Sequence, residues 1–395
     1  MATRADLPAY RRAAIVGLGM TEMGNVYGRT AQGFAAEAVR RAAADAGLQL
    51  SDIDGLLVSA GVTRAVDLSL QLDLGLRDLR LLSQMQAFGS TAGAMVAYAA
   101  MAVESGTVDT VACVFADDPL REGRSAGAVY TGRARPQGWA GLREASGFAN
   151  PTTQYALAAR RHMHSFGTTS EQFGAIAVAQ RAWAGMNPLA RMREPITVAD
   201  HHASRFIAEP LRLLDCCLVS NGGVAMIVTS GGRAASLAQP PVPVLGWGQA
   251  HPGTHWRRDD DFGLVSGAAV AGPAALEMAG VAVEDVDVVE LYDCYTYTVL
   301  LTLEDYGFCK KGEGGAFVAT PGVLGPGGSL PLNTGGGQLS AYYMWGMTPL
   351  SEAIVQARGQ AGERQADQHD VVLVSGNGGA LDHHSTLVLG GGSRS

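Results

Sequence analysis

Two tyrosine-rich stretches and one glycine-rich stretch in the second half of the chain carry groups suited to acid–base chemistry. They are Tyr292-Asp293-Cys294-Tyr295, Tyr342-Tyr343 and Gly376-Asn377-Gly378-Gly379. A tyrosine can act as a general base or acid, although lowering its pKa from about 10 to about 7 takes roughly 4 kcal/mol of differential stabilisation. Helix N-termini and the backbone amides of the glycine-rich stretch are groups that could supply this stabilisation.

The cysteines and histidines give weaker indications. Five cysteines without CxxC spacing argue against a disulfide framework or a zinc knuckle, so reduced thiols are expected. Cys294 is either a nucleophile or a small buried hydrophobic residue, which is commoner, and Cys216-Cys217 lies in a strand-forming stretch. His201-His202 lacks the spacing and carboxylate partner of a metal site, so no metal is predicted. His383-His384 belongs either to the site or, more commonly, to the core or the solvent-facing surface.

The elements that must position these residues are indicated by an echo between the two halves of the chain. Residues 46–54, AGLQLSDID, return as residues 279–287, AGVAVEDVD. Each copy follows an Ala-rich helical pattern and precedes an apolar run typical of a buried strand. A helix joined by a short turn to a buried strand, built twice, predicts a duplicated layered α/β fold with a crevice between its halves.

Composition excludes several classes of function. The 395 residues are 47% hydrophobic, which predicts a globular chain with a large core. The net charge of −8 without a basic cluster argues against nucleic acid. No signal-peptide pattern and no apolar run of about 18 residues is present, so neither secretion nor a membrane is indicated and the cytoplasm is expected.

The organisation of the chain follows from the echo and from one interruption. Residues 117–212 break the alternation of strands and helices, are rich in Arg, Gly and His, and carry helical segments at 154–164 and 171–186. We interpret them as an inserted cap. Residues 1–116 and 213–238 then form the N-terminal half, and residues 239–395 form the C-terminal half.

The order of these motifs resembles the thiolase superfamily, in its sterol-carrier or lipid-transfer branch. The resemblance covers essentially the whole chain, and the order and spacing of its motifs make it specific. It implies a five-layer αβαβα fold with an inserted cap, an obligate dimer and a tunnel for coenzyme A thioesters. The motifs that carry it are the small-residue helix ending at Gly106, the 209–225 stretch EPLRLLDCCLVSNGGVA, the 289–295 stretch VELYDCY, GFCKKGEG at 307–314, NTGGGQL at 333–339 and SGNGG at 375–379.

Departures from the family pattern are more informative than the match. A thiolase places its nucleophilic Cys at the N-terminus of the small-residue helix, where the helix dipole stabilises a thiolate, and that position is Gly89 here. The second reactive Cys is missing as well, since none occurs from 371 to 380. The resemblance places Tyr343 at the family's catalytic His and Tyr292 at its catalytic Asn. Without a thiolate no acyl-enzyme forms, so ordinary thiolysis is not expected.

The double-tyrosine pattern is similar to that of the thiolase-like aldolases of steroid side-chain degradation. This resemblance implies retro-aldol cleavage of a β-hydroxyacyl-CoA with a bulky, steroid-like acyl group, giving a ketone or aldehyde and a shortened acyl-CoA such as propionyl-CoA or acetyl-CoA. Tyr343 would take the β-hydroxyl proton and Tyr292 would donate to the enolate, or the reverse. Gly89, Asn377, Gly378 and Gly379 would bind the substrate or its oxyanion. No cofactor is required, because coenzyme A is part of the substrate.

The sequence leaves two alternative functions open and predicts two kinds of assembly. The alternatives are an acyltransferase that uses Cys294 and a non-catalytic lipid-binding or acyl-CoA-binding subunit. The apolar-edged strand at 81–86, which has no charge to protect it, predicts a homodimer. The chain carries no OB-fold or zinc-ribbon pattern, so a DUF35-type (OB-fold) partner implied by the resemblance would bind in trans, in a heterotetramer.

Overall fold

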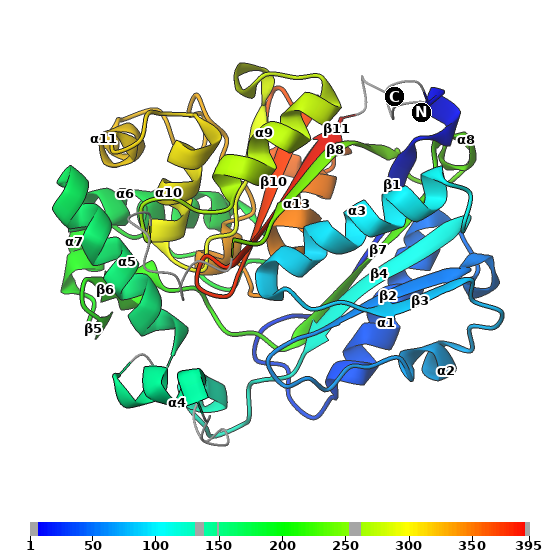
Figure 1. Cartoon of the computed structure of the whole chain (residues 1–395), viewed down its shortest axis with the longest axis horizontal. Coiled ribbons are helices and arrows are strands. Elements are labelled where there is room, and N and C mark those ends of the chain that lie inside the picture. Colours follow the sequence, from blue (N-terminus) through cyan, green and yellow to red (C-terminus); the bar gives the residue numbers. More distant parts are fainter. Residues whose placement is uncertain (1–6, 131–137, 148–149, 253–261, 392–395) are drawn as a thin grey trace.

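The computed structural model describes residues 7–130, 138–147, 150–252 and 262–391 (Figure 1). Within these ranges, no helix is long and apolar enough to cross a membrane. The first half of the chain contributes β1 (Ala13–Met20), α1 (Ala31–Ala46), β2 (Gly55–Ala60), α2 (Leu70–Leu74), β3 (Leu81–Gln84), α3 (Thr91–Glu104), β4 (Thr110–Asp117), β7 (Gly222–Ser230) and α8 (Gly231–Ala234).

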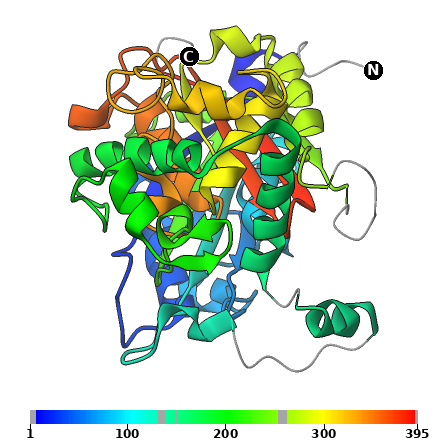
Figure 2. The same cartoon turned by 90° about the vertical axis from the view of Figure 1, so that its left-hand side faces the viewer.

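Helices dominate the segment between β4 and β7. The segment contains α4 (Gly138–Ala145), α5 (Pro151–Phe166), α6 (Ser170–Met186), α7 (Val198–Ala203), β5 (Phe206–Ala208) and β6 (Leu211–Arg212). Helices α5 to α7 gather at one end of the molecule, beside α10 and α11 (Figures 1 and 2). The second half consists of β8 (Val242–Ala250), α9 (Ala268–Ala279), β9 (Val288–Glu290), α10 (Thr296–Tyr306), α11 (Gly314–Ala319), α12 (Gly337–Ser340), α13 (Met347–Ala357), β10 (Val371–Gly378) and β11 (His383–Gly390).

One mixed sheet runs through both halves, in the strand order β3-β2-β4-β7-β1-β8-β11-β10-β9. The order β2-β4-β7-β1 in the first half is matched by β9-β10-β11-β8 in the second. The halves meet where β1 pairs with β8 over only two residue pairs, Ala14 with Pro243 and Ile15 with Val242. The repeated strand order is the topological counterpart of the sequence echo.

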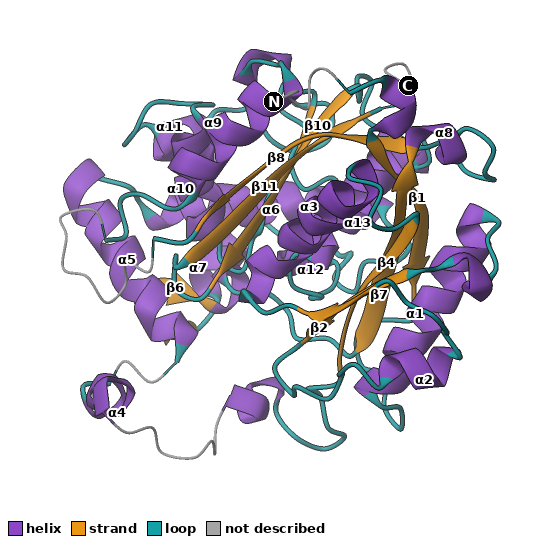
Figure 3. Cartoon of the chain, turned by 45° about the vertical axis from the view of Figure 1, so that its right-hand side comes forward, coloured by secondary structure: helices purple, strands orange, loops and turns teal. Residues whose placement is uncertain are grey.

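The two halves of this sheet count as two layers, and helices form three more layers around and between them. This confirms the predicted five-layer fold. Helices α3 and α13 contact strands of both halves and lie between them, α1 covers the outer face of the first half, and α9 covers that of the second (Figure 3). Both outer helices lie very close to the sheet. A Cβ at Gly19 would lie 2.1 Å from the carbonyl oxygen of Ala38, and one at Gly248 would lie 2.0 Å from that of Ala271.

Small residues allow α3 to fit between the two half-sheets. Every residue of α3 except Tyr98 and Met101 is buried, which is expected of a helix covered on all sides. A Cβ at Gly93 would lie 2.6 Å from the hydroxyl oxygen of Ser385 on β11. The tight fit places the N-terminus of α3 beside the end of β10, where the glycine-rich stretch lies.

The echo is built in the same way in both halves. Gly47 and Gly280 end their helices with φ of 74° and 69°, a backbone conformation that favours glycine. In the turn that follows, the carboxylate of Asp52 accepts from the backbone N–H of Gln49, and that of Asp285 accepts from Ala282, at 2.8 Å in each case. Because these contacts are local, the sequence predicts them well.

Some expectations of element position were wrong. Cys216 and Cys217 are not in a strand but follow a short 3-10 turn, and Cys216 forms an isolated bridge with Tyr295. The sequence pattern of residues 351–359 predicts a helix there, but the helix spans 347–357. The Pro-rich stretch at 240–243 predicts a linker before a strand that starts at 244, but residues 242 and 243 already belong to β8. In each case contacts with distant segments decide the boundary, which local pattern does not reveal.

Candidate active site

The structure brings Tyr292 and Tyr343 together. Tyr292 lies in the loop between β9 and α10, Tyr343 lies in the loop between α12 and α13, and their hydroxyl oxygens are 3.2 Å apart. Each loop is anchored by its backbone, because the N–H of Tyr292 donates to Ser375 Oγ at 3.1 Å and that of Tyr343 donates to Ser220 Oγ at 3.0 Å. Tyr292 is buried and Tyr343 is half-buried. Two phenols in contact can share or transfer a proton.

Neighbouring tyrosines have other surroundings. The hydroxyl of Tyr342 lies 2.8 Å from Ser351 Oγ in the core, so Tyr342 points away from Tyr343. The hydroxyl of Tyr295 lies 2.9 Å from Thr152 Oγ1, and its ring centroid is 4.8 Å from that of Tyr155 on α5. Tyr342 is therefore a packing residue. Tyr295 packs the loop after β9 against α5.

Gly89, two residues before α3, leaves space for the Tyr292 ring. A Cβ at Gly89 would lie 2.1 Å from Cε2 and 2.2 Å from Cζ of Tyr292, and 2.4 Å from the carbonyl oxygen of Asn377. Real Cβ atoms do not approach other atoms so closely, so no residue larger than glycine fits while the ring stays where it is. The phenol of Tyr292 thus occupies the space that a side chain at position 89 would need.

The glycine-rich stretch closes the site from the other side. A Cβ at Gly378 would lie 2.0 Å from the carbonyl oxygen of Ala87, so the end of β10 contacts the approach to Gly89. The side-chain Nδ2 of Asn377 donates to the hydroxyl of Tyr155 at 2.7 Å, and that hydroxyl donates to the carbonyl oxygen of Gly379 at 2.8 Å. The predicted residues Gly89, Asn377, Gly378 and Gly379 are therefore adjacent in space.

Asp293 connects the two tyrosine loops. Its carboxylate accepts from the backbone N–H of Gln338 at 2.9 Å and of Leu339 at 3.1 Å, and from Gln338 Nε2 at 3.2 Å. Burial raises the pKa of Asp293 to about 6, against the lowering effect of these three donors. Since Asp293 follows Tyr292, and since Leu339 is four residues before Tyr343, this carboxylate fixes one loop against the other.

Comparison with known proteins gives the family. Residues 248–391 match the family model described as "Thiolase C-terminal domain-like". The chain is 38% identical to the "Steroid side-chain-cleaving aldolase" of Thermomonospora curvata, over 96% of this chain and 97% of the relative. It is also 38% identical to the "17-hydroxy-3-oxo-4-pregnene-20-carboxyl-CoA lyase" of Mycobacterium tuberculosis, over 96% and 99% of the two chains. The chain belongs to the thiolase superfamily.

A solved structure agrees with this assignment. The structure of the "Ltp2-ChsH2(DUF35) aldolase" superposes with a TM-score of 0.85 at 35% identity, covering 97% of this chain and 99% of the other. The resemblance stated from the motifs, to the superfamily and to its steroid side-chain aldolases, is thus confirmed by both sequence and structure.

The cysteines lack the surroundings that thiolase chemistry requires. Cys294 is buried, and this burial raises the pKa of its thiol to about 12. Burial likewise raises the pKa of Cys216 to about 12 and that of Cys217 well above its usual value. A superfamily nucleophile needs the opposite, a thiolate stabilised by a helix N-terminus or a cation. Cys294 is therefore a poor candidate for an acyl-carrying residue.

The two histidines near the glycine-rich stretch have different surroundings. His384 is buried with Nε2 2.9 Å from the Tyr306 hydroxyl, and burial lowers its pKa to about 3, so it stays neutral. His383 lies with Nδ1 3.1 Å from Nδ1 of His251, and its ring stacks on Phe88 with centroids 6.3 Å apart. His384 is thus a core residue, whereas His383 lies between Phe88 and His251.

His201 differs from the sequence-based expectation, because it does have a carboxylate partner. Its Nε2 lies 2.8 Å from Asp215 Oδ1, which also accepts from the Thr296 hydroxyl at 2.6 Å. The partner was missed because Asp215 lies beyond the inserted segment. In the described ranges, no group of three or more His, Cys, Asp or Glu side chains is placed to hold a metal ion.

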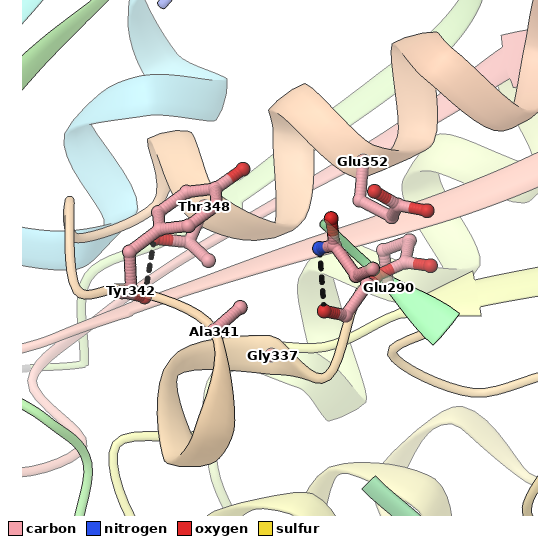
Figure 4. A pocket seen from close by; sticks show the side chains of 8 residues that line it. Glu290, Gly337, Ala341, Tyr342, Thr348 and Glu352 are labelled. Atoms are coloured by element: carbon pink, nitrogen blue, oxygen red, sulfur yellow. Dashed lines mark hydrogen bonds between the residues drawn. The ribbon is translucent and has the colours of Figure 1, made fainter. Parts of the chain in front are cut away.

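A small cavity is lined by Tyr342 but by neither Tyr292 nor Tyr343. Glu290 and Glu352 line one side of it and Tyr342 and Thr348 the other (Figure 4). The Thr334 hydroxyl is 2.7 Å from Glu290 Oε1 and 3.2 Å from Glu352 Oε1. Burial, then the charge of Glu352, raises the pKa of Glu290 well above its usual range. This network stabilises the loop before α12 rather than contacting the tyrosine hydroxyls.

Sequence reasoning did not single out Tyr155. It lies in α5, inside the inserted segment, in a helical pattern without a motif, and 222 residues separate it from its partner Asn377. Buried tyrosines in helices are mostly packing residues, so only the tertiary structure places this one beside the site.

Proposed function

We propose that this thiolase-superfamily protein cleaves a β-hydroxyacyl-CoA by a retro-aldol reaction. The observation that carries the proposal is the pair of phenols 3.2 Å apart, in space that glycine leaves open at position 89. Two relatives that are 38% identical along nearly the whole chain are named as an aldolase and a lyase, which supports the same reaction type.

The residues suit each step of this reaction. Deprotonated Tyr343 takes the β-hydroxyl proton, and the Cα–Cβ bond breaks with its electron pair passing to the thioester as an enolate. Tyr292 donates a hydrogen bond to the enolate oxygen, and a proton then returns to Cα. The roles of the two phenols are interchangeable in this proposal. Gly89 and the 377–379 stretch line the thioester end of the site, and no covalent acyl-enzyme forms.

The substrate we propose is a steroid-like acyl-CoA with a hydroxyl on the β-carbon. One relative is named for 17-hydroxy-3-oxo-4-pregnene-20-carboxyl-CoA. In that compound C20 is the α-carbon and the hydroxyl-bearing C17 is the β-carbon, so breaking the bond between them gives a 17-ketosteroid and propionyl-CoA. Coenzyme A belongs to the substrate, and we propose no additional cofactor.

The assembly we propose is a homodimer bound to a DUF35-type protein. The superposed structure is named for a DUF35 component, which supports such a partner for this chain. The edge strand β3 exposes Leu82, which supports pairing with a second copy. We place the assembly in the cytoplasm, in keeping with the absence of a disulfide pattern among the five cysteines.

To test this, the chain is incubated with 17-hydroxy-3-oxo-4-pregnene-20-carboxyl-CoA in the absence of free coenzyme A. The assay is run once with a DUF35 partner and once without it. We expect equal amounts of 17-ketosteroid and propionyl-CoA by liquid chromatography. Turnover that depends on added coenzyme A would instead indicate an acyltransferase. Binding without turnover under either condition would indicate a lipid-binding subunit, and robust turnover by the chain alone would remove the partner from the proposal.

A further inference from the structure

The hydroxyl of Tyr155 is the point where the inserted segment contacts the glycine-rich stretch. Tyr155 is 3% exposed and comes from α5, whereas Asn377 and Gly379 lie at the end of β10. Its ring packs against Tyr295 on the loop that carries Tyr292. One buried side chain thus touches two of the chain segments that make up the site.

The hydrogen bonds of Tyr155 fix the orientation of Asn377. The carbonyl oxygen of Gly379 can only accept, so the single hydroxyl hydrogen of Tyr155 is used there, at 2.8 Å. The hydroxyl can then only accept from Asn377, at 2.7 Å, so the side-chain group of Asn377 that faces it must be the NH2. The amide of Asn377 therefore has one allowed orientation of the two that usually compete.

This orientation leaves an acceptor unused. Asn377 is 3% exposed, and its side-chain Oδ1 is buried with no hydrogen-bond partner among the residues described. Buried polar atoms are normally paired, and an exception calls for an explanation such as a ligand. Since the backbone carbonyl oxygen of Asn377 lies beside Gly89, where the Tyr292 ring packs, a ligand that reaches the tyrosine pair is the natural donor for Oδ1.

We infer that Tyr155 is a positioning residue for the reaction at Tyr292 and Tyr343, acting through Asn377. It holds the amide so that Oδ1 is kept for the ligand, and it fixes the end of β10 against Gly89 and the Tyr292 ring. Its single hydroxyl hydrogen is donated to Gly379, so the hydroxyl has no hydrogen left to donate to the substrate. The inserted segment thereby contributes to the placement of reacting groups, not only to enclosing the ligand. The inference rests on the proposed lyase activity for its kinetic readout.

The experiment compares Tyr155→Phe with Tyr297→Phe. Tyr297 is also a buried tyrosine and donates to a backbone carbonyl, that of Gly263, but it lies in α10 and its ring packs against Phe173. Tyr155→Phe keeps the ring against Tyr295 and should lower kcat about tenfold with KM changed less than about twofold, because placement rather than binding is lost. Tyr297→Phe should destabilise the fold comparably and leave kcat close to that of the wild type.

A double-mutant cycle with Asn377→Ala shows whether Tyr155 acts through Asn377 or whether its loss weakens the packing of the whole site. We expect Asn377→Ala to lower kcat at least as much as Tyr155→Phe, and the double variant to be no worse than Asn377→Ala alone. Additive losses, a loss confined to KM, or a kcat of Tyr155→Phe within about twofold of the wild type would overturn the inference. Should Tyr155→Phe fail to fold, Asn377→Ala removes the same hydrogen bond and must lower kcat by at least about tenfold.

A second measurement does not depend on turnover. Hydrogen–deuterium exchange at residues 378–382 should be faster in Tyr155→Phe and unchanged in Tyr297→Phe, because only the first change removes a bond to this stretch. If wild-type protein shows no lyase activity with its partner, the proposed function fails while this exchange difference still decides the role of Tyr155. Unchanged exchange in both variants would overturn it.

Discussion

The two halves of the molecule have the same strand order, but their strand ends differ. In the second half, β9 leads into Tyr292 and β10 ends at the Asn377 stretch. In the first half, the corresponding β4 ends at Asp117, whose carboxylate accepts from the backbone N–H of Val62 at 2.6 Å and of Thr63 at 3.1 Å. The first-half loop is thus tied to its own sheet, whereas the second-half loops present side chains to one another.

The first half contributes space instead of functional side chains. Gly89 and the small residues of α3 let the second-half loops approach closely enough for Tyr292 to lie over position 89. A duplicated fold has two equivalent sets of strand ends. Here the second half carries the tyrosines and the first half carries small residues, so the candidate site forms where the two sets meet.

The largest effect is expected from the phenols of the second half. Tyr343→Phe and Tyr292→Phe each remove an interaction made mainly in the transition state, so kcat should fall by about 100-fold or more with little change in KM. Because both phenols act in one proton-transfer sequence in the proposed mechanism, the double variant should be far from additive with the single ones. Acyl-CoA release measured for the four proteins tests this, and near-normal turnover in both single variants would mean that the phenols only pack.

Gly89→Ala tests whether the first half supplies space. The added Cβ would overlap the Tyr292 ring, so the ring must move and kcat should fall by about tenfold to 100-fold. Gly127→Ala is a matched control, because a Cβ there meets nothing within 4 Å. Unfolding free energies should be non-additive when Gly89→Ala is combined with Tyr292→Ala, which removes the obstructing ring. Additive values, or normal turnover of Gly89→Ala, would contradict the steric account.

Asp293, which lies in the second half of the chain, should make the free energy of unfolding depend on pH. Its pKa is raised from 3.8 to about 6 by burial, so the folded state binds an extra proton between these values. The stability contribution is therefore complete below about pH 4 and lost as the pH rises through 6, by up to about 3 kcal/mol. Urea unfolding at pH 4 and pH 7 should show a larger decline for wild type than for Asp293→Asn. Equal declines in the two proteins would count against the raised pKa.

The echo itself should matter for stability alone, in both halves. Asp54 accepts from the backbone N–H of Asp109 and Thr110, and Asp287 accepts from that of Val371. Asp54→Ala and Asp287→Ala should each lower the free energy of unfolding by about 1–3 kcal/mol, with kcat unchanged in the folded protein. Denaturant unfolding and steady-state kinetics on the pair measure this, and a kcat loss in only one of them would show that the scaffold is not symmetric.

Cys294→Ala should have the smallest effect. The buried thiol, with its pKa raised to about 12, has no role in the proposed steps, so turnover should stay within about twofold and the loss should be one of packing. Iodoacetamide should leave most of the activity intact. Loss of activity on alkylation together with an inactive Cys294→Ala would favour the acyltransferase over the retro-aldolase.

Local pattern determined much of the molecule. The helices at 31–46 and 268–279 coincide with the two Ala-rich patterns before the echo, and the strand at 55–60 coincides with the apolar run after its first copy. Apolar periodicity and C-terminal glycines act over a few residues, so the sequence predicts these elements. The absence of cysteine at position 89 and at 371–380 argued against ordinary thiolysis, and the resemblance to steroid side-chain aldolases, carried by the tyrosines at 292 and 343, favoured a retro-aldolase.

Only the tertiary structure decided which side chains meet. It directs Tyr342 into the core and Tyr343 toward Tyr292, makes glycine necessary at position 89, and brings Tyr155 to Asn377 across 222 residues of chain. It also fixes the burial that raises the pKa of Cys294 and Asp293. These properties arise from contacts between distant segments, whose steric fit and desolvation are not encoded in any one stretch of sequence.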